Sequence, residues 1–212
     1  LAVTSALKLP ETHPPERRTR LAVRQLLAAS TRVAAHREFL LLALAAALTF
    51  AGVFGYIGAA PAIVFDHWGY SETQFFWLFL PVVGGFTIGA TLSGRLAGRI
   101  PPMRQAAVGF AIGVIACSVR VVLHWQLDAV PIWLQQVMLF LTGIATQLIF
   151  PILTLRMLDL FPAARGAAAS MQTFVALIVA SITIGFLVPL VQADLTHLAL
   201  LSAAAVWTAL IL

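Results

Sequence analysis

The chain has 212 residues, of which 61% are hydrophobic and only 10% are charged, and its mean hydropathy is +0.97. This is more apolar surface than a soluble core of this length can bury, and a single cysteine with so little charge also excludes a disulfide-stapled or disordered chain. The net charge of +5 does not indicate nucleic-acid binding, because the basic residues are spread over separate stretches between apolar segments. We therefore expect an all-α membrane protein.

The first part of the chain is predicted to connect two membrane domains. Residues 1–10 resemble the last turns of a helix, and the chain starts without methionine, so we expect a fragment of a longer protein. Residues 16–38 carry six arginines around Leu21, Leu26 and Val33, a pattern typical of a basic amphipathic helix on the cytoplasmic membrane surface. The alternative is a loop with scattered arginines.

Six apolar segments follow this basic stretch. A helix needs about 20 residues to cross a hydrocarbon core of about 30 Å, and five segments reach that length. The sixth is cut short by the end of the chain. The segments are residues 39–65, 75–94, 105–123, 132–154, 166–191 and 198–212.

Several of these segments contain residues that modify a plain apolar helix. The first is expected to break near Gly58 and Pro61, and the fourth at Gly143 and Pro151. Secondary transporters often repeat a three-helix unit, so that interruptions at equivalent places in helices one and four border a substrate path. In the second segment Gly85 and Gly89 form a G-x-x-x-G pair, expected to be a close helix contact for which an absent half of the protein is a candidate partner.

The charges predict how the segments are oriented. Twelve of the 13 Lys and Arg residues, all but Arg120, lie in residues 8–37, 95–104 and 156–165, which the positive-inside rule places in the cytoplasm. The remaining connections have no Lys or Arg and are expected outside. Their acids are Asp66, Glu72, Asp128 and Asp194. Connections this short force neighbouring helices to be antiparallel, so one bundle is expected.

Two cytoplasmic turns resemble motifs of the major facilitator superfamily. Residues 94–104, read as GRLAGRIPPMR, resemble the signature between helices two and three that recurs between helices eight and nine. An aspartate usually stands where this chain has Gly98. Residues 159–166, read as DLFPAARG, resemble the turn after helix ten.

A narrower resemblance is to the Bcr/CflA drug-resistance transporters. It lies in residues 9–18, read as LPETHPPERR, and in a spaced set of residues around the first long segment. That set is Tyr56, Ile57, Pro61, Gly69, Ser71 and Phe75. In that family the first string follows helix six and the second belongs to helix seven. The resemblance implies that residues 1–10 end helix six, residues 11–38 form the cytoplasmic linker and residues 39–212 form helices seven to twelve.

What this resemblance implies is proton-coupled efflux of small hydrophobic drugs or antibiotics across the bacterial inner membrane. The expected partners are such a substrate, the lipid bilayer and an amino-terminal half of the same protein, with the proton gradient as driving force and no cofactor. The alternative is a major facilitator exporter or importer of a metabolite such as a sugar or nucleoside. No catalytic, phosphate-binding or metal-binding motif indicates an enzyme.

The residues proposed to line a substrate path come from three segments. In the fourth, a polar arc that includes Thr146 and Gln147 lies opposite an apolar arc that includes Ile144 and Leu148, which we expect to face lipid. Interhelical hydrogen bonding is the alternative role for the polar residues. In the fifth segment, Gln172 accompanies a strip of alanines for which helix packing is favoured over binding. The candidates are Thr49, Phe54, Tyr56, Gln136, Thr146, Gln147 and Gln172.

Charged residues define a second set of candidates at the cytoplasmic side. We expect Asp159 to pair with Arg99 or Arg104 when that side closes, although a solvated surface pair is the alternative. The gate candidates are Arg95, Arg99, Arg104, Asp159 and Arg165.

Arg120 is expected to extend outward toward the headgroups. Since every acid lies near a segment end or in a loop, the proton-carrying acid is expected in the other half of the transporter.

Overall fold

The structure is a computed structural model that describes residues 23–127 and 129–212, and every regular element in that part is helical. The α-helices are α2 (Val23–Ala34), α3 (Arg37–Gly58), α4 (Phe76–Leu96), α5 (Pro102–Gln126), α6 (Ile132–Asp159), α7 (Arg165–Ile182), α8 (Val188–Val191) and α9 (Leu195–Ile211). Five stretches are long and apolar enough to cross a membrane, and α9 is a shorter apolar helix. The expected all-α membrane fold is confirmed.

The helices lie at the positions that hydropathy predicts. α5 extends a few residues beyond the expected segment at both ends, and α6 begins at the expected residue but extends to Asp159, because polar residues continue the helices past the apolar run. The predicted helix end at residues 1–10, the linker up to residue 22 and Asp128 lie outside the described residues. Within the linker, α2 occupies Val23–Ala34.

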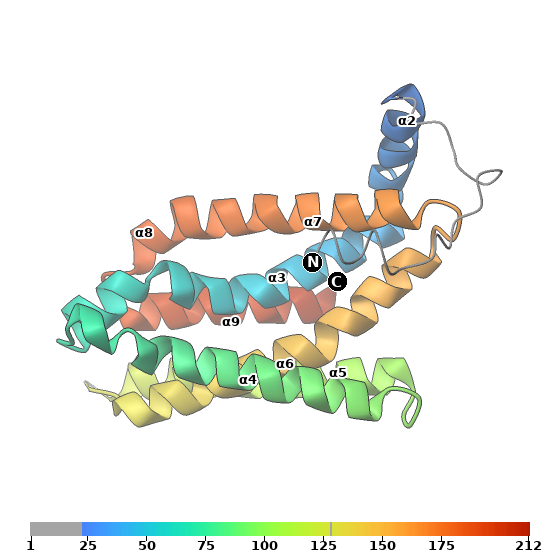
Figure 1. Cartoon of the computed structure of the whole chain (residues 1–212). Helices are drawn as coiled ribbons and strands as arrows, with labels where there is room; N and C mark the ends of the chain where they lie inside the picture. Colours follow the sequence, from blue (N-terminus) through green and yellow to red (C-terminus); the bar gives the residue numbers. More distant parts are fainter. Residues whose placement is uncertain (1–22, 128) are drawn as a thin grey trace, which may run out of the picture.

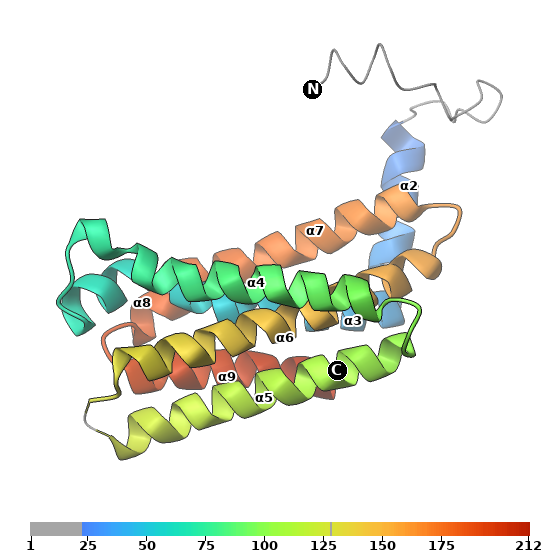
Figure 2. The same cartoon turned by 60° about the horizontal axis from the view of Figure 1, so that its bottom comes forward.

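The described parts of the basic stretches lie at one end of the bundle (Figure 1). The α4–α5 turn, the α6–α7 turn and α2 all lie at the right of that view, while the α3–α4 and α8–α9 connections lie at the left. The same separation is visible after rotation in Figure 2. The arrangement matches the antiparallel bundle and the charge separation that the sequence predicts.

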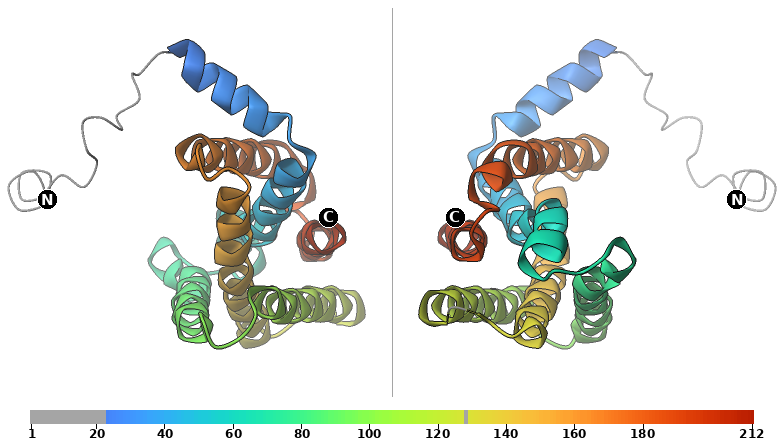
Figure 3. Two further views of the ribbon diagram at one scale, coloured as in Figure 1. Left: turned by 90° about the vertical axis from the view of Figure 1, so that its right-hand side faces the viewer. Right: turned by 90° about the vertical axis from the view of Figure 1, so that its left-hand side faces the viewer.

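α6 is the central helix of the bundle. Seen from the ends in Figure 3, it lies among the other helices, and it packs against α3, α4, α5 and α7. Ile144 and Leu148 are consequently buried, at 8% and 3% exposure. The expectation that this apolar side faces lipid is therefore wrong for Ile144 and Leu148, which neighbouring helices cover, whereas Val137 on the same arc is 41% exposed.

The expected helix interruptions are only partly observed. α3 ends at Gly58, and a π-helical turn at Ala62–His67 continues the first segment. α6, in contrast, is one continuous helix that contains Pro151, so the break predicted for the fourth segment is wrong. A second π-helical turn, Thr183–Leu187, lies instead in the fifth segment, between α7 and α8.

α4 approaches α6 closely where two glycines meet. A Cβ atom at Gly85 would collide with the backbone carbonyl of Phe140 and lie 3.2 Å from the Cα atom of Gly143. A Cβ atom at Gly89 would lie 2.8 Å from the carbonyl oxygen of Ile144. The G-x-x-x-G pair therefore packs within this bundle, and the suggestion that it packs against an absent half is wrong.

We predict that Gly85→Ala destabilises the bundle by about 1 to 3 kcal/mol, because the backbone of α6 has to move to admit the methyl group. Gly94→Ala in the same helix is the matched control, since a Cβ atom at Gly94 meets nothing within 4 Å. Alanine favours the helix over glycine by about 1 kcal/mol, so this control should be neutral or stabilising. Thermal unfolding of the two purified variants in detergent measures the difference, and equal melting temperatures would contradict the close approach.

Candidate functional site

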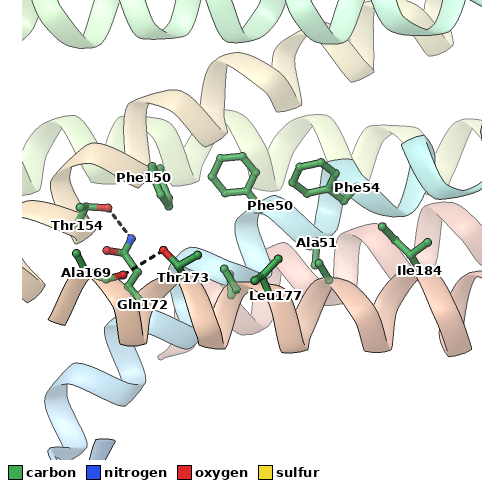
Figure 4. A pocket seen from close by; sticks show the side chains of 13 residues that line it. Phe50, Ala51, Phe54, Phe150, Thr154, Ala169, Gln172, Thr173, Leu177 and Ile184 are labelled. Atoms are coloured by element: carbon green, nitrogen blue, oxygen red, sulfur yellow. Dashed lines mark hydrogen bonds between the residues drawn. The ribbon is translucent and has the colours of Figure 1, made fainter. Parts of the chain in front are cut away.

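A cavity of about 510 Å³ lies between α3, α6 and α7 (Figure 4). Its aromatic wall is formed by Phe50 and Phe54 of α3 and Phe150 of α6. The ring centroids of Phe50 and Phe54 are 5.5 Å apart in a stacked arrangement, and those of Phe50 and Phe150 are 4.8 Å apart, edge to face. The three rings thus form a continuous aromatic surface along one side of the cavity.

The opposite wall comes from one face of α7. The i, i+3/i+4 spacing of a helix brings its small and aliphatic side chains to that face. They are Ala169, Thr173, Ala176, Leu177 and Ala180, followed by Ile184 in the π-helical turn. The alanine strip for which packing was favoured therefore lines a cavity among the described residues.

The polar groups of the cavity are concentrated at the end near the α6–α7 turn. Gln172 is buried, and its Nε2 atom donates a hydrogen bond of 2.7 Å to Oγ1 of Thr154. The hydroxyl group of Thr173 donates to the carbonyl of Ala169 at 3.1 Å. The described residues that line the cavity include no charged side chain. The site can therefore bind an apolar or aromatic molecule that carries few hydrogen-bonding groups.

Of the seven predicted substrate-path residues, the structure places Phe54 and Gln172 in this cavity. Thr49 and Thr146 lie instead at the contact of α3 with α6. The hydroxyl group of Thr49 donates to the carbonyl of Ala46 at 2.7 Å, and that of Thr146 donates to the carbonyl of Thr142 at 2.9 Å. These two bonds lie within the helices, and the hydroxyl group of Thr146 also donates to the carbonyl of Thr49 at 3.4 Å across the α3–α6 contact, which is the interhelical role given as the alternative.

Two further candidates lie between α6 and α4. Nε2 of Gln136 donates to the carbonyl of Trp77 at 3.0 Å, and the Cβ atom of Gln147 lies close to Gly89. Tyr56 is buried on another side of α3, beneath the guanidinium group of Arg120. The cavity residues that were not among the predicted candidates include Phe50, Phe150 and Thr154. The i, i+4 spacing of Phe50 and Phe54 is a signal that could have found the first of these.

Arg120 does not extend outward as expected. Its side chain is only 1% exposed, its Cζ atom lies 4.2 Å above the ring centroid of Tyr56, and Nη2 donates to Oγ of Ser202 at 2.7 Å. The aromatic face and the hydroxyl group lie on α3 and α9, on the inner side of α5. These two contacts hold the cation inside the bundle.

The ion pairs at the end of the bundle that carries the α6–α7 turn also differ from the predicted ones. Asp159 pairs with Arg165 at 3.0 Å, rather than with Arg99 or Arg104. Because Asp159 and Arg165 flank one short turn, this pair is local. A second pair joins Glu38 at the start of α3 to Arg156 near the end of α6, at 2.9 Å, and the sequence analysis did not identify it.

At the opposite end of the bundle, Asp194 caps α9. Its Oδ1 atom accepts a hydrogen bond of 2.7 Å from the backbone N–H of Thr196, and Oδ2 lies 3.6 Å from Nδ1 of His197. The hydrogen bonds from Thr196 are the largest cause that holds the pKa of this carboxyl group below its usual value. Within residues 23–127 and 129–212, no group of three or more His, Cys, Asp or Glu side chains is placed to hold a metal ion.

Helices long and apolar enough to cross a membrane, with an uncharged cavity between them, are typical of membrane transport proteins. The profile of the Major Facilitator Superfamily matches residues 1–184, and the chain belongs to this family. Its members are secondary transporters, so this chain is part of a multi-pass secondary transporter. Comparisons with curated proteins and with solved structures gave no match.

We predict that the cap of α9 weakens in acid. A carboxyl group whose pKa is lowered on folding stabilises the folded state above its unfolded pKa of about 3.9, and this contribution is lost as the pH falls through the lower folded value. Asp194→Asn keeps a capping side chain but removes the titration. The loss of melting temperature between pH 6 and pH 3 should therefore be smaller in Asp194→Asn than in the parent protein. An identical loss in both would contradict this role of Asp194.

Proposed function

We propose that this bundle is the carboxy-terminal half of a proton-coupled efflux transporter of the Bcr/CflA type. In this proposal it exports small hydrophobic compounds, including antibiotics, across the bacterial inner membrane. The observation that carries the proposal is the cavity between α3, α6 and α7, with its aromatic wall and its single polar end. The motif resemblance in residues 9–18 and around Tyr56 supports the same assignment.

The size and chemistry of the cavity favour a hydrophobic substrate over a sugar or nucleoside. Its volume of about 510 Å³ lies within the range of about 300 to 1,000 Å³ that is usual for small-molecule sites. Each 100 Å² of apolar surface that leaves water contributes about 2.5 kcal/mol to binding. A sugar, in contrast, would leave most of its hydroxyl groups without partners against Phe50, Phe54 and Phe150, which is unfavourable.

The exposed faces of α4 and α7 support a missing companion domain. Leu80 and Leu177 are each 62% exposed, and Phe174 of α7 is 57% exposed. In the proposal, parts of these faces contact the amino-terminal half and the rest contact lipid. The cavity adjoins α7, so a substrate bound there would lie between the two halves, where secondary transporters commonly place their sites.

Proton coupling is assigned to the amino-terminal half. Asp66 and Asp159 are both exposed at ends of the bundle, and no carboxyl group lines the cavity among the described residues. A proton-carrying acid in a transporter is expected inside the membrane, near the path of the substrate. The pairs Asp159–Arg165 and Glu38–Arg156 are then proposed to hold the cytoplasmic ends of α3, α6 and α7 together, with Arg95, Arg99 and Arg104 available as alternative partners.

We predict that Phe54→Ala in the complete transporter weakens the binding of a hydrophobic aromatic dye roughly tenfold, because the ring supplies apolar contact area and aromatic stacking. Phe174→Ala is the matched control, since Phe174 faces away from the cavity and is 57% exposed. Fluorescence titration of the purified protein measures the affinity, and dye accumulation in cells that lack other efflux pumps measures export. Equal affinities in the two variants, or transport of a nucleoside but no hydrophobic compound, would contradict the proposal.

We further predict that Asp66→Asn and Asp159→Asn leave proton coupling intact, because neither carboxylate lies in the membrane interior or in the cavity. Export into proteoliposomes should still depend on an imposed pH gradient and should stop when a protonophore is added. If either substitution alone abolished this dependence while substrate binding persisted, the coupling acid would lie in this half.

A further inference from the structure

A second polar cluster lies on a different side of α3 from the aromatic cavity. We define the Arg120 cluster as Arg120 and His124 of α5, Tyr56 of α3 and Ser202 of α9. Tyr56 follows Phe54 by two residues, which turns its side chain by about 200° around the helix axis, away from the cavity. The cluster therefore belongs to the contact of α3, α5 and α9.

Hydrogen-bond donors outnumber acceptors in this cluster. Nη2 of Arg120 donates to Ser202, whose own hydroxyl group donates to the carbonyl of Gly52 at 2.6 Å. Nε and Nη1 of Arg120, the hydroxyl group of Tyr56 and Nε2 of His124 are all buried and have no hydrogen-bond partner among the described residues. Each of these four atoms can donate a hydrogen bond, Nε2 of His124 in the tautomer that carries its proton there.

The cluster also carries an unbalanced positive charge. Arg120 stays protonated in proteins, and it forms no ion pair with an acid in residues 23–127 and 129–212. The face of the Tyr56 ring offsets only part of the cost of burying this charge. Water could accept the unused hydrogen bonds, but it would leave the charge without a counterion. An anion would satisfy both requirements.

A polar pocket near the α8–α9 connection adjoins this cluster at His124. The pocket has a volume of about 490 Å³ and is lined by residues that include His67, His124, Gln135 and Thr196. His124 lies one helical turn from Arg120, at i+4 on α5, so it borders both the pocket and the buried guanidinium group. Asp194 also lines the pocket, but its carboxylate is engaged with Thr196 and His197.

We propose that the Arg120 cluster binds a small monovalent anion, either chloride or a small carboxylate, which reaches it through the polar pocket at His124. Arg120 supplies the charge and two N–H donors, and the Tyr56 hydroxyl group and His124 supply the others. The bound anion neutralises the buried cation and stabilises the contact of α3, α5 and α9. This inference is independent of the drug-efflux proposal, because it concerns another side of α3.

The test measures melting temperature of the complete transporter in detergent, at constant ionic strength and constant sodium concentration. Sodium gluconate, whose anion is too bulky for the buried cluster, is replaced stepwise by sodium chloride or by sodium acetate. We expect a saturable rise of a few degrees, as for any ligand that binds only the folded state. A larger rise with chloride identifies a halide site, and a larger rise with acetate identifies a carboxylate site. The same melting temperature in all three salts would overturn the proposal.

Two variants test whether the anion-dependent rise in melting temperature comes from the Arg120 cluster. Arg120→Met removes the charge with little change in volume and should abolish the rise. Arg99→Met, at the exposed cytoplasmic turn, should leave the rise unchanged. Persistence of the response in Arg120→Met would overturn the assignment to this cluster. If Arg120→Met does not fold, Tyr56→Phe tests the assignment instead. This variant keeps the ring under the guanidinium group and removes only the hydroxyl group. It should raise the half-saturating anion concentration about tenfold, and an unchanged value would count against the site.

Discussion

A polar group that enters the hydrocarbon region of this bundle has to find its partner within the protein, because lipid offers none. The hydroxyl groups show how the sequence meets this constraint. Thr49, Thr142 and Thr146 each donate to a carbonyl of the preceding turn, and Ser202 of α9 donates to the carbonyl of Gly52 on α3. Helix contacts built this way need no charged residue. The cation of Arg120 is the departure from this pattern, and it is the group for which a further partner is required.

Close packing around α6 determines where space remains. α4 can approach α6 to backbone contact because Gly85 and Gly143 carry no side chains at the crossing. Gln105 strengthens the neighbouring contact, with its Nε2 atom donating to Ser93 of α4 and to the carbonyl of Leu148 of α6. α7 has no such glycine contact with α6, and the side chains of Phe50 and Phe150 stand between them. The cavity thus lies on the loosely packed side of the central helix.

The sequence was sufficient for the helices and their order, because length and hydropathy constrain these properties directly. It was insufficient for the contacts between helices. The apolar side of α6 was assigned to lipid because a single helix does not indicate that neighbouring helices cover Ile144 and Leu148. Arg120 was assigned to the surface because its partner Ser202 is 82 residues away in the chain. For the cavity, residue type identified Phe54 and Gln172, but Thr49 and Thr146 have polar side chains as well and form hydrogen bonds within their helices and across the α3–α6 contact instead.

The π-helical turn at Thr183–Leu187 allows one helix to serve two surfaces. Ile184 lines the cavity, whereas Val188, four residues later, is 1% exposed and packs in the core beside Tyr56 and Leu198. The wider turn inserts the equivalent of one extra residue, which changes the rotational phase of everything after it by about 100°. Substitutions in the cavity wall along α7 can therefore accumulate without changing how α8 packs in the core. The cavity wall and α8 lie on opposite sides of a change in helical register.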